Sequence, residues 1–216
     1  MAFAGAIYTA LQYQRAKRAR ALDLSISFIS QLDTVPELSF ACQALDWGVG
    51  PMIVPERYRP LLEARRQEGS DTRSPGERGE VLEHDTSLMT AALEPYLNFD
   101  YSQCPAGLVY RYCFDKLFQH LSNIERLVAG GQLDLTDLGI LRYWLERIAI
   151  YEYPPSDVPG DLVFQPFLSF PEFGYGGVMT LGKRLGVSNW TYGPRKQGCH
   201  EYGRSSTLAL PPEQSS

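Results

Sequence analysis

Residues 114–148 read FDKLFQHLSNIERLVAGGQLDLTDLGILRYWLERI, and they carry the strongest periodic pattern in the chain. Large apolar side chains recur at alternating intervals of four and three residues through five turns, which is the spacing of one helix face. The residues on this face are Tyr110, Phe114, Leu117, Leu121, Ile124 and Val128. Gly130 and Gly131 follow as a C-terminal cap, so the pattern predicts a long core helix.

A second helix is expected directly after this one. Asp134 or Thr136 can cap its N-terminus, because short polar side chains accept hydrogen bonds from the first free amides of a helix. Four apolar residues then share its inner face: Leu138, Leu141, Leu145 and Ile148. The link from Val128 to Asp134 is short, so we expect the two helices to form an antiparallel hairpin.

Further helical patterns precede the hairpin. Leu22, Ile26 and Ile29 share one face of a helix that Pro36 ends, and another helix begins near Glu37. A short helix starts at Pro55, and the apolar spacing over residues 81–93 predicts one more. Residues 65–80 read as an exposed, mobile loop. The fold class is therefore an all-α helical bundle with a helical hairpin core.

The composition changes after residue 153. Prolines and glycines interrupt the sequence so often that residues 154–216 are expected to form an irregular, basic, Gly- and Pro-rich C-terminal extension. Within it, LVFQPFLSF (162–170) reads as a short strand or as an apolar strap over the bundle. Residues 177–184, GVMTLGKR, have the G-x-x-x-x-G-K frame of a phosphate-binding loop, but Arg184 stands where such a loop needs Ser or Thr. A basic glycine loop is the preferred interpretation.

The N-terminal residues 1–13, MAFAGAIYTALQY, form an apolar run with Thr9 and Gln12 as the clear polar interruptions. As a helix at about 1.5 Å per residue, this run covers roughly 20 Å, whereas the hydrocarbon core of a bilayer is roughly 30 Å thick. It is expected either to dip into one leaflet or to be the second half of a span that begins upstream. A soluble helix packed on the core is the alternative.

Basic residues follow this run. The order of apolar helix, aromatic Tyr8 and Tyr13, and then a basic cluster is typical of the cytoplasmic end of a membrane helix. We predict that residues 1–20 form a membrane-proximal helix and residues 21–153 the bundle domain. The predicted membrane-contact residues are Phe3, Ile7, Leu11, Arg15, Lys17, Arg18 and Arg20.

The charge of the chain is divided along its length. The 216 residues carry a net charge of −5, but residues 1–20 hold four bases and no acid. Residues 21–172 hold 11 bases and 23 acids, and residues 173–204 hold five bases and one acid. Basic ends on an acidic body favour contact with an anionic surface such as phospholipid headgroups. The acidic total argues against general nucleic-acid binding.

The candidate catalytic and metal-binding residues form no recognisable constellation. Cys42, Cys104, Cys113 and Cys199 are widely separated and read as independent thiols of a chain in a reducing cytosol. His84 has no second histidine at i+4, and His120 is expected on the exposed side of the core helix. We therefore expect no catalytic residues, no metal and no cofactor, and the sequence favours a protein that is not an enzyme.

Residues 6–150 resemble a family of uncharacterised bacterial proteins known only by a domain of unknown function. The resemblance rests on IYTALQYQRAKRARALDLSISFIS (7–30), on the helix after a proline, and on residues 114–148. It implies one N-terminal membrane span and a cytosolic helical domain, and it supplies no catalytic residues. The chain departs from the pattern in lacking a complete span and in its long C-terminal extension.

These observations predict a non-catalytic membrane-associated interaction or scaffold protein at the cytoplasmic face of a membrane. Its expected partner is an anionic membrane surface or a protein bound through the N-terminus. The first alternative is a cytoplasmic soluble subunit that uses its N-terminal helix to dock into a larger assembly. The second alternative is a nucleotide-binding regulator that uses Gly177 to Arg184.

Overall fold

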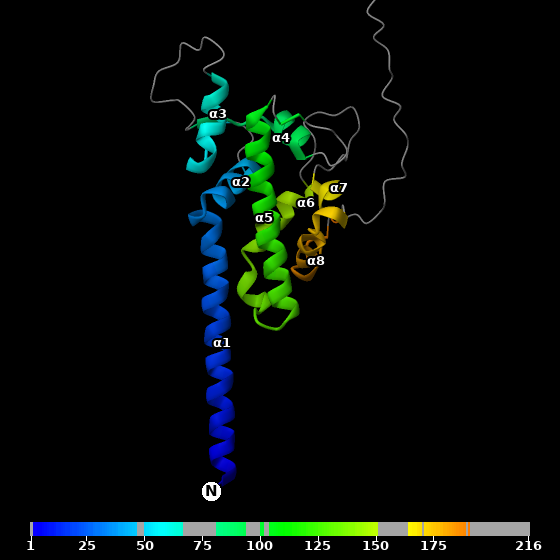
Figure 1. The fold of residues 1–216 in the computed structure, drawn as a ribbon. Coiled ribbons are helices and arrows are strands. Elements are labelled where there is room, and N and C mark those ends of the chain that lie inside the picture. Colours follow the sequence, from blue (N-terminus) through cyan, green and yellow to red (C-terminus); the bar gives the residue numbers. More distant parts are fainter. Residues whose placement is uncertain are drawn as a thin grey trace, which may run out of the picture.

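A long helix leads into a helical body, which holds one small sheet (Figure 1). The computed structural model describes residues 2–46, 50–66, 81–93, 100–101, 104–150, 164–169, 171–188 and 190. Its α-helices are α1 (Ala2–Thr34), α2 (Pro36–Asp46), α3 (Arg59–Arg66), α4 (Thr86–Leu93), α5 (Pro105–Ala129), α6 (Leu141–Ile150), α7 (Phe164–Ser169) and α8 (Gly176–Arg184). The 3-10 turns are η1 (Glu56–Tyr58), η3 (Leu135–Leu138) and η4 (Pro171–Phe173), and the strands are β1 (Pro51–Ile53) and β2 (Val81–Glu83). The all-α fold class is confirmed.

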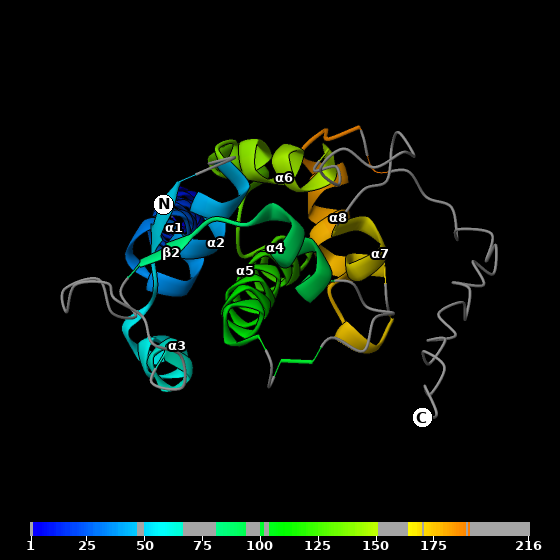
Figure 2. The ribbon, with the colours of Figure 1, turned by 90° about the horizontal axis from the view of Figure 1, so that it is seen from above.

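Helix α5 is the centre of the body, and it packs most extensively against α8, α2 and α4 (Figure 2). The predicted inner face is correct, because Tyr110, Phe114, Leu117, Leu121 and Ile124 are completely buried. Pro105 occupies the first turn of the helix, where its missing N–H costs nothing. At the other end the chain turns through Gly131, whose φ of 67° is a conformation that glycine adopts without strain.

After this turn the chain reverses and returns to the body through η3 and α6. Asp134 caps η3, since its carboxylate accepts a hydrogen bond from the amide of Thr136 at 3.0 Å. Leu138, Leu141, Leu145 and Ile148 are fully buried, as their spacing predicts. Helix α6 makes its main contacts with α2, α8 and α7, and α5 is not among its main partners. The chain does reverse after α5, but the two helices do not pack on each other as the antiparallel hairpin predicted from the short link.

The segment from Val81 to Glu83 corrects one prediction. These residues form strand β2 and pair antiparallel with β1, in a register that places Met52 opposite Leu82. Helix α4 begins only at Thr86, where Asp85 accepts a hydrogen bond from the amide of Leu88 at 2.9 Å. An aspartate in this position caps a helix start and separates it from the strand. Residues 67–80 of the predicted mobile loop lie outside the described residues.

The helical body extends further along the chain than the boundary at residue 153 suggests. Helices α7 and α8 follow that boundary, and Phe164, Phe167 and Leu168 of α7 are buried. Their i, i+3, i+4 spacing is helical, so within the predicted strand or strap the described residues, 164–169, form a short helix instead. Phe164 stacks on Phe114 with ring centroids 5.1 Å apart. Residues 191–216 of the predicted extension lie outside the described residues.

Candidate functional site

The N-terminal half of α1 projects away from the body (Figure 1). Every residue from Ala6 to Arg20 is exposed, although several of them are large and apolar. Ile7 is 50% exposed, Leu11 49% and Tyr13 71%. The side chain of Phe3, the remaining apolar contact predicted from the sequence, lies outside those that the structure describes. An apolar helix end without cover within the chain is a candidate contact surface.

The four predicted basic contacts lie on the same helix. Arg15, Lys17, Arg18 and Arg20 are all exposed and occupy the turns between the apolar end and the body. Helix α1 runs through this segment without a break, so the bases and the apolar residues belong to one continuous rod. The helix predicted over residues 1–20 and the helix predicted around Leu22, Ile26 and Ile29 are therefore one helix.

The C-terminal half of α1 is fixed to the body. Ala21 is half-buried, and Ser25 and Leu32 are buried, so packing begins one residue after the last base. His120 of α5 reaches this segment, and its Nε2 lies 3.0 Å from the carbonyl oxygen of Phe28. The histidine ring also packs against the Phe28 ring, with centroids 5.4 Å apart. This bond ties α1 to the central helix.

The prediction that His120 is a surface residue is therefore wrong. Its side chain is only 8% exposed, and burial lowers the pKa of the imidazole, while the bond to Phe28 opposes that effect. A neutral imidazole can donate from Nε2 to a carbonyl, which is the arrangement found here. The signal was present in the sequence, because His120 lies three residues after Leu117 and four before Ile124, on the apolar face.

The turn after α5 lies beside the basic segment. Hydrogen bonds from the amide and the hydroxyl of Thr136 lower the pKa of the Asp134 carboxyl, and the positive charge of Arg18 adds to this effect. Helix α1 contacts η3, and this contact agrees with the effect of Arg18 on Asp134. The basic residues therefore adjoin one end of the body instead of standing far from it.

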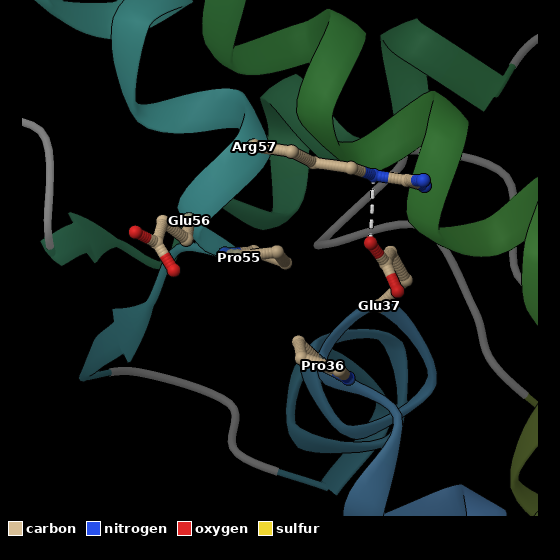
Figure 3. A pocket seen from close by; sticks show the side chains of 5 residues that line it. All are labelled: Pro36, Glu37, Pro55, Glu56 and Arg57. Carbon is tan, nitrogen blue, oxygen red and sulfur yellow. Dashed lines mark ion pairs between the residues drawn. The ribbon is translucent and has the colours of Figure 1, made fainter.

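A shallow depression of about 430 Å³ lies between the starts of α2 and η1 (Figure 3). Pro36, Pro55 and Glu56 line it together with Glu37 and Arg57, which form an ion pair at 2.7 Å. The Arg57 guanidinium also lies over the Tyr58 ring, 4.5 Å from its centroid. Because Glu37 and Arg57 are paired with each other, we interpret the depression as the place where two elements meet and not as a ligand site.

The GVMTLGKR segment is helical. Gly177 to Arg184 lie in α8, where successive amides bond along the helix instead of converging on a phosphate. Gly182 gives room to the indole of Trp190, since a Cβ at this position would lie 2.2 Å from its Nε1. Gly177 meets Ser122 of α5, and a Cβ there would approach it to 3.3 Å. These glycines allow close packing within a helix, so the prediction of a basic glycine loop over residues 177–184 is wrong.

The contacts of the His84 side chain indicate a structural role. Its Nδ1 lies 3.0 Å from the hydroxyl oxygen of Tyr110, which also accepts a hydrogen bond from the amide of Asp85 at 3.1 Å. Burial is the main cause that lowers the pKa of His84, and the neighbouring Asp85 opposes it. Within the described ranges, no group of three or more His, Cys, Asp or Glu side chains could hold a metal ion.

The described cysteines are free thiols. Cys42 and Cys113 are buried, and burial, with a smaller effect of Asp33 and Asp46, raises the pKa of Cys42 to about 12. Burial likewise raises the pKa of Cys113. Because the thiolate is the reactive form of cysteine, both side chains are poor nucleophiles at neutral pH.

Comparison with known proteins adds no further constraint: no family model, no curated protein and no solved structure matches the chain. In the part of the chain that the structure describes, no helix combines the length and the apolar character needed to cross a bilayer. The resemblance to a bacterial family with an N-terminal span stays a prediction.

Proposed function

We propose that the protein is a non-catalytic membrane-associated interaction or scaffold protein, which the N-terminal half of α1 attaches to the cytoplasmic face of an anionic membrane. The observation that carries this proposal is the projecting half-helix, whose apolar end and basic segment are both exposed. Such a pair of signals matches the two layers of a membrane surface, hydrocarbon and phosphate.

The energetics require both parts of the helix. Each base near an anionic surface contributes about 1 kcal/mol, so the four bases together supply roughly 4 kcal/mol at low salt. Burial of Ile7 and Leu11, which are each about half exposed, adds an apolar contribution at about 25 cal/mol per Å². Either contribution alone gives marginal, reversible binding, and the two together give stable attachment.

The body has the opposite electrostatic character. Residues 21–172 hold 23 acids and 11 bases, so an anionic membrane repels this part of the chain. Attachment through α1 would leave the rest of the body free for protein partners. Three large apolar side chains in α6 and directly before it are exposed and could contact such partners: Ile140 is 57% exposed, Tyr143 46% and Ile150 45%.

Docking of α1 into a protein groove is the second candidate function. The exposure of Ile7 and Leu11 favours it equally, because a helix with uncovered apolar side chains also fits a hydrophobic groove. The basic segment distinguishes the two candidates. A lipid surface requires the bases as a group and responds to salt, whereas groove binding depends mainly on the apolar side chains.

Vesicle sedimentation tests the proposal. We expect the full chain to sediment with vesicles of equimolar phosphatidylcholine and phosphatidylglycerol at low salt, and not with vesicles of phosphatidylcholine alone. Changing Arg15, Lys17, Arg18 and Arg20 to Gln should weaken sedimentation at least tenfold and remove most of its dependence on salt.

A matched variant controls for net charge. Lys116, Arg126, Arg142 and Lys183 are also exposed but lie on the body, and changing these four to Gln alters the charge of the protein by the same amount. This variant should sediment like the unmodified protein. If the two quadruple variants behave alike, or if the unmodified chain stays in solution beside anionic vesicles at low salt, the membrane proposal is wrong and groove docking gains support.

A further inference from the structure

The polar and apolar side chains in the first twenty residues of α1 are separated along the helix axis, not around it. The residues from Ala6 to Tyr13 contain two clearly polar side chains, Thr9 and Gln12, and no charge. All four bases follow within the next seven residues, and all are exposed. A helix that lies flat on a membrane shows the reverse arrangement, with apolar and basic faces running side by side along its length.

The angular positions make this contrast specific. At about 100° per residue, Leu11 is turned by about 40° from Ile7, while Arg18 and Arg15 are turned by about 20° and 80°. These two bases therefore share the apolar face of Ile7 and Leu11. Lys17 lies on the other flank of this face, at about 280°, and Arg20 lies opposite it, at about 220°. The bases form a ring around the helix, and a flat orientation would press two of them into the hydrocarbon.

We propose that α1 enters the membrane end on, with its axis near the bilayer normal, so that the basic ring lies at the lipid phosphates and residues 2–12 lie in the hydrocarbon. This inference rests on the proposed membrane attachment and specifies its geometry. The ring fits a layer of anionic headgroups because a surface perpendicular to the helix offers phosphates on every side. Tyr13, which is 71% exposed and adjoins the ring, lies at the interface where tyrosine side chains accumulate.

The same geometry determines which end of the body faces the membrane. Ala21 is half-buried against the body, so packing begins directly after the ring. The turn between α5 and η3 lies at this end, whereas α3 lies at the end of the molecule away from the N-terminus (Figure 1). An end-on helix therefore holds the turn near the headgroups and keeps α3 in solution. Helix α1 contacts η3 at this end of the body, and Arg18 of the ring is near enough to Asp134 to contribute to lowering its pKa.

Two leucines on one face of α1 distinguish end-on from flat binding. Leu11 and Leu22 are eleven residues apart and therefore only about 20° apart around the axis. They are 49% and 45% exposed, which makes them a matched pair. In the flat orientation both side chains enter the membrane to the same depth. In the end-on orientation they differ in depth by about 16 Å, and only Leu11 lies in the hydrocarbon.

The experiment uses the full chain with Leu11→Trp or Leu22→Trp, bound to anionic vesicles whose lipids carry bromine atoms in their acyl chains. The unmodified protein provides the signal of the native tryptophans, which is subtracted. We expect at least fivefold stronger quenching at position 11 than at position 22. Equal quenching at the two positions overturns end-on entry in favour of a flat helix, and absence of quenching at both in vesicle-bound protein overturns insertion of any kind. Failure of the unmodified chain to bind vesicles would instead refute the membrane attachment itself.

Discussion

Replacing Gly182 by alanine should destabilise the protein, although alanine is the better helix former. The new Cβ would lie 2.2 Å from Nε1 and 2.8 Å from Cε2 of Trp190, and this indole is only 6% exposed. Forcing an extra methyl group into a packed site costs about 1–3 kcal/mol. Because the contact of 2.2 Å lies far inside van der Waals distance, the cost should lie in the upper half of this range, about 2–3 kcal/mol. The gain from replacing glycine inside a helix is about 0.5–1 kcal/mol, so we expect a net loss of about 1–2.5 kcal/mol.

Urea denaturation followed by circular dichroism measures this loss. Gly139→Ala is the matched control, because Gly139 has φ −54° and a Cβ added there would meet no heavy atom within 4 Å, so it should change stability by less than about 0.5 kcal/mol. Unchanged or increased stability of Gly182→Ala would refute the packing of Trp190 on α8. It would also mean that Gly182 in GVMTLGKR is not required for close packing.

Two further predictions concern the core. Leu121 is fully buried in α5, so Leu121→Ala should lower the free energy of unfolding by about 2–5 kcal/mol in urea denaturation, and a loss below about 1 kcal/mol would contradict its place in the core. Burial lowers the pKa of both His84 and His120 below 6.5, so the unfolded chain binds more protons and stability should fall as the pH drops below about 6.5. Unfolding measured from pH 8 to pH 5 checks this slope, which the double variant His84→Gln, His120→Gln should flatten; an unchanged slope in the double variant would assign the pH dependence to other groups.

The sequence predicts the helices that repeat one period over several turns. The inner face of α5 and the buried leucines of η3 and α6 follow directly from apolar spacing, and the break between α1 and α2 follows from Pro36. The exposed half of α1 was predictable as a helix from its apolar, alanine-rich composition, not from a periodic face. Its separation from the body was not, because apolar spacing does not tell whether a face meets protein or another surface.

Other features depend on contacts between distant parts of the chain. Strand β2 forms because Val81 to Glu83 find β1 some thirty residues earlier, and three residues are too few to show the alternation of a strand. Helix α8 contains glycines that discourage a helix prediction, yet Gly177 and Gly182 fit because Ser122 and Trp190 occupy the space beside them. His120 was predicted on the surface because histidine is polar, although its position between Leu117 and Ile124 places it on the apolar face of α5.

The most direct test of the account compares Leu11→Glu with Leu22→Glu in sedimentation with anionic vesicles. Both substitutions place the same charge on the same face of α1 at positions of similar exposure, and circular dichroism can confirm that the helix is retained. Losing the burial of one leucine, worth about 1.5–3 kcal/mol, should weaken membrane binding by Leu11→Glu by about tenfold or more. We expect Leu22→Glu to bind anionic vesicles nearly as well as the unmodified protein. Binding by Leu11→Glu as tight as that of the unmodified protein would contradict attachment through the projecting half of α1, whereas equal weakening of both variants would contradict end-on entry.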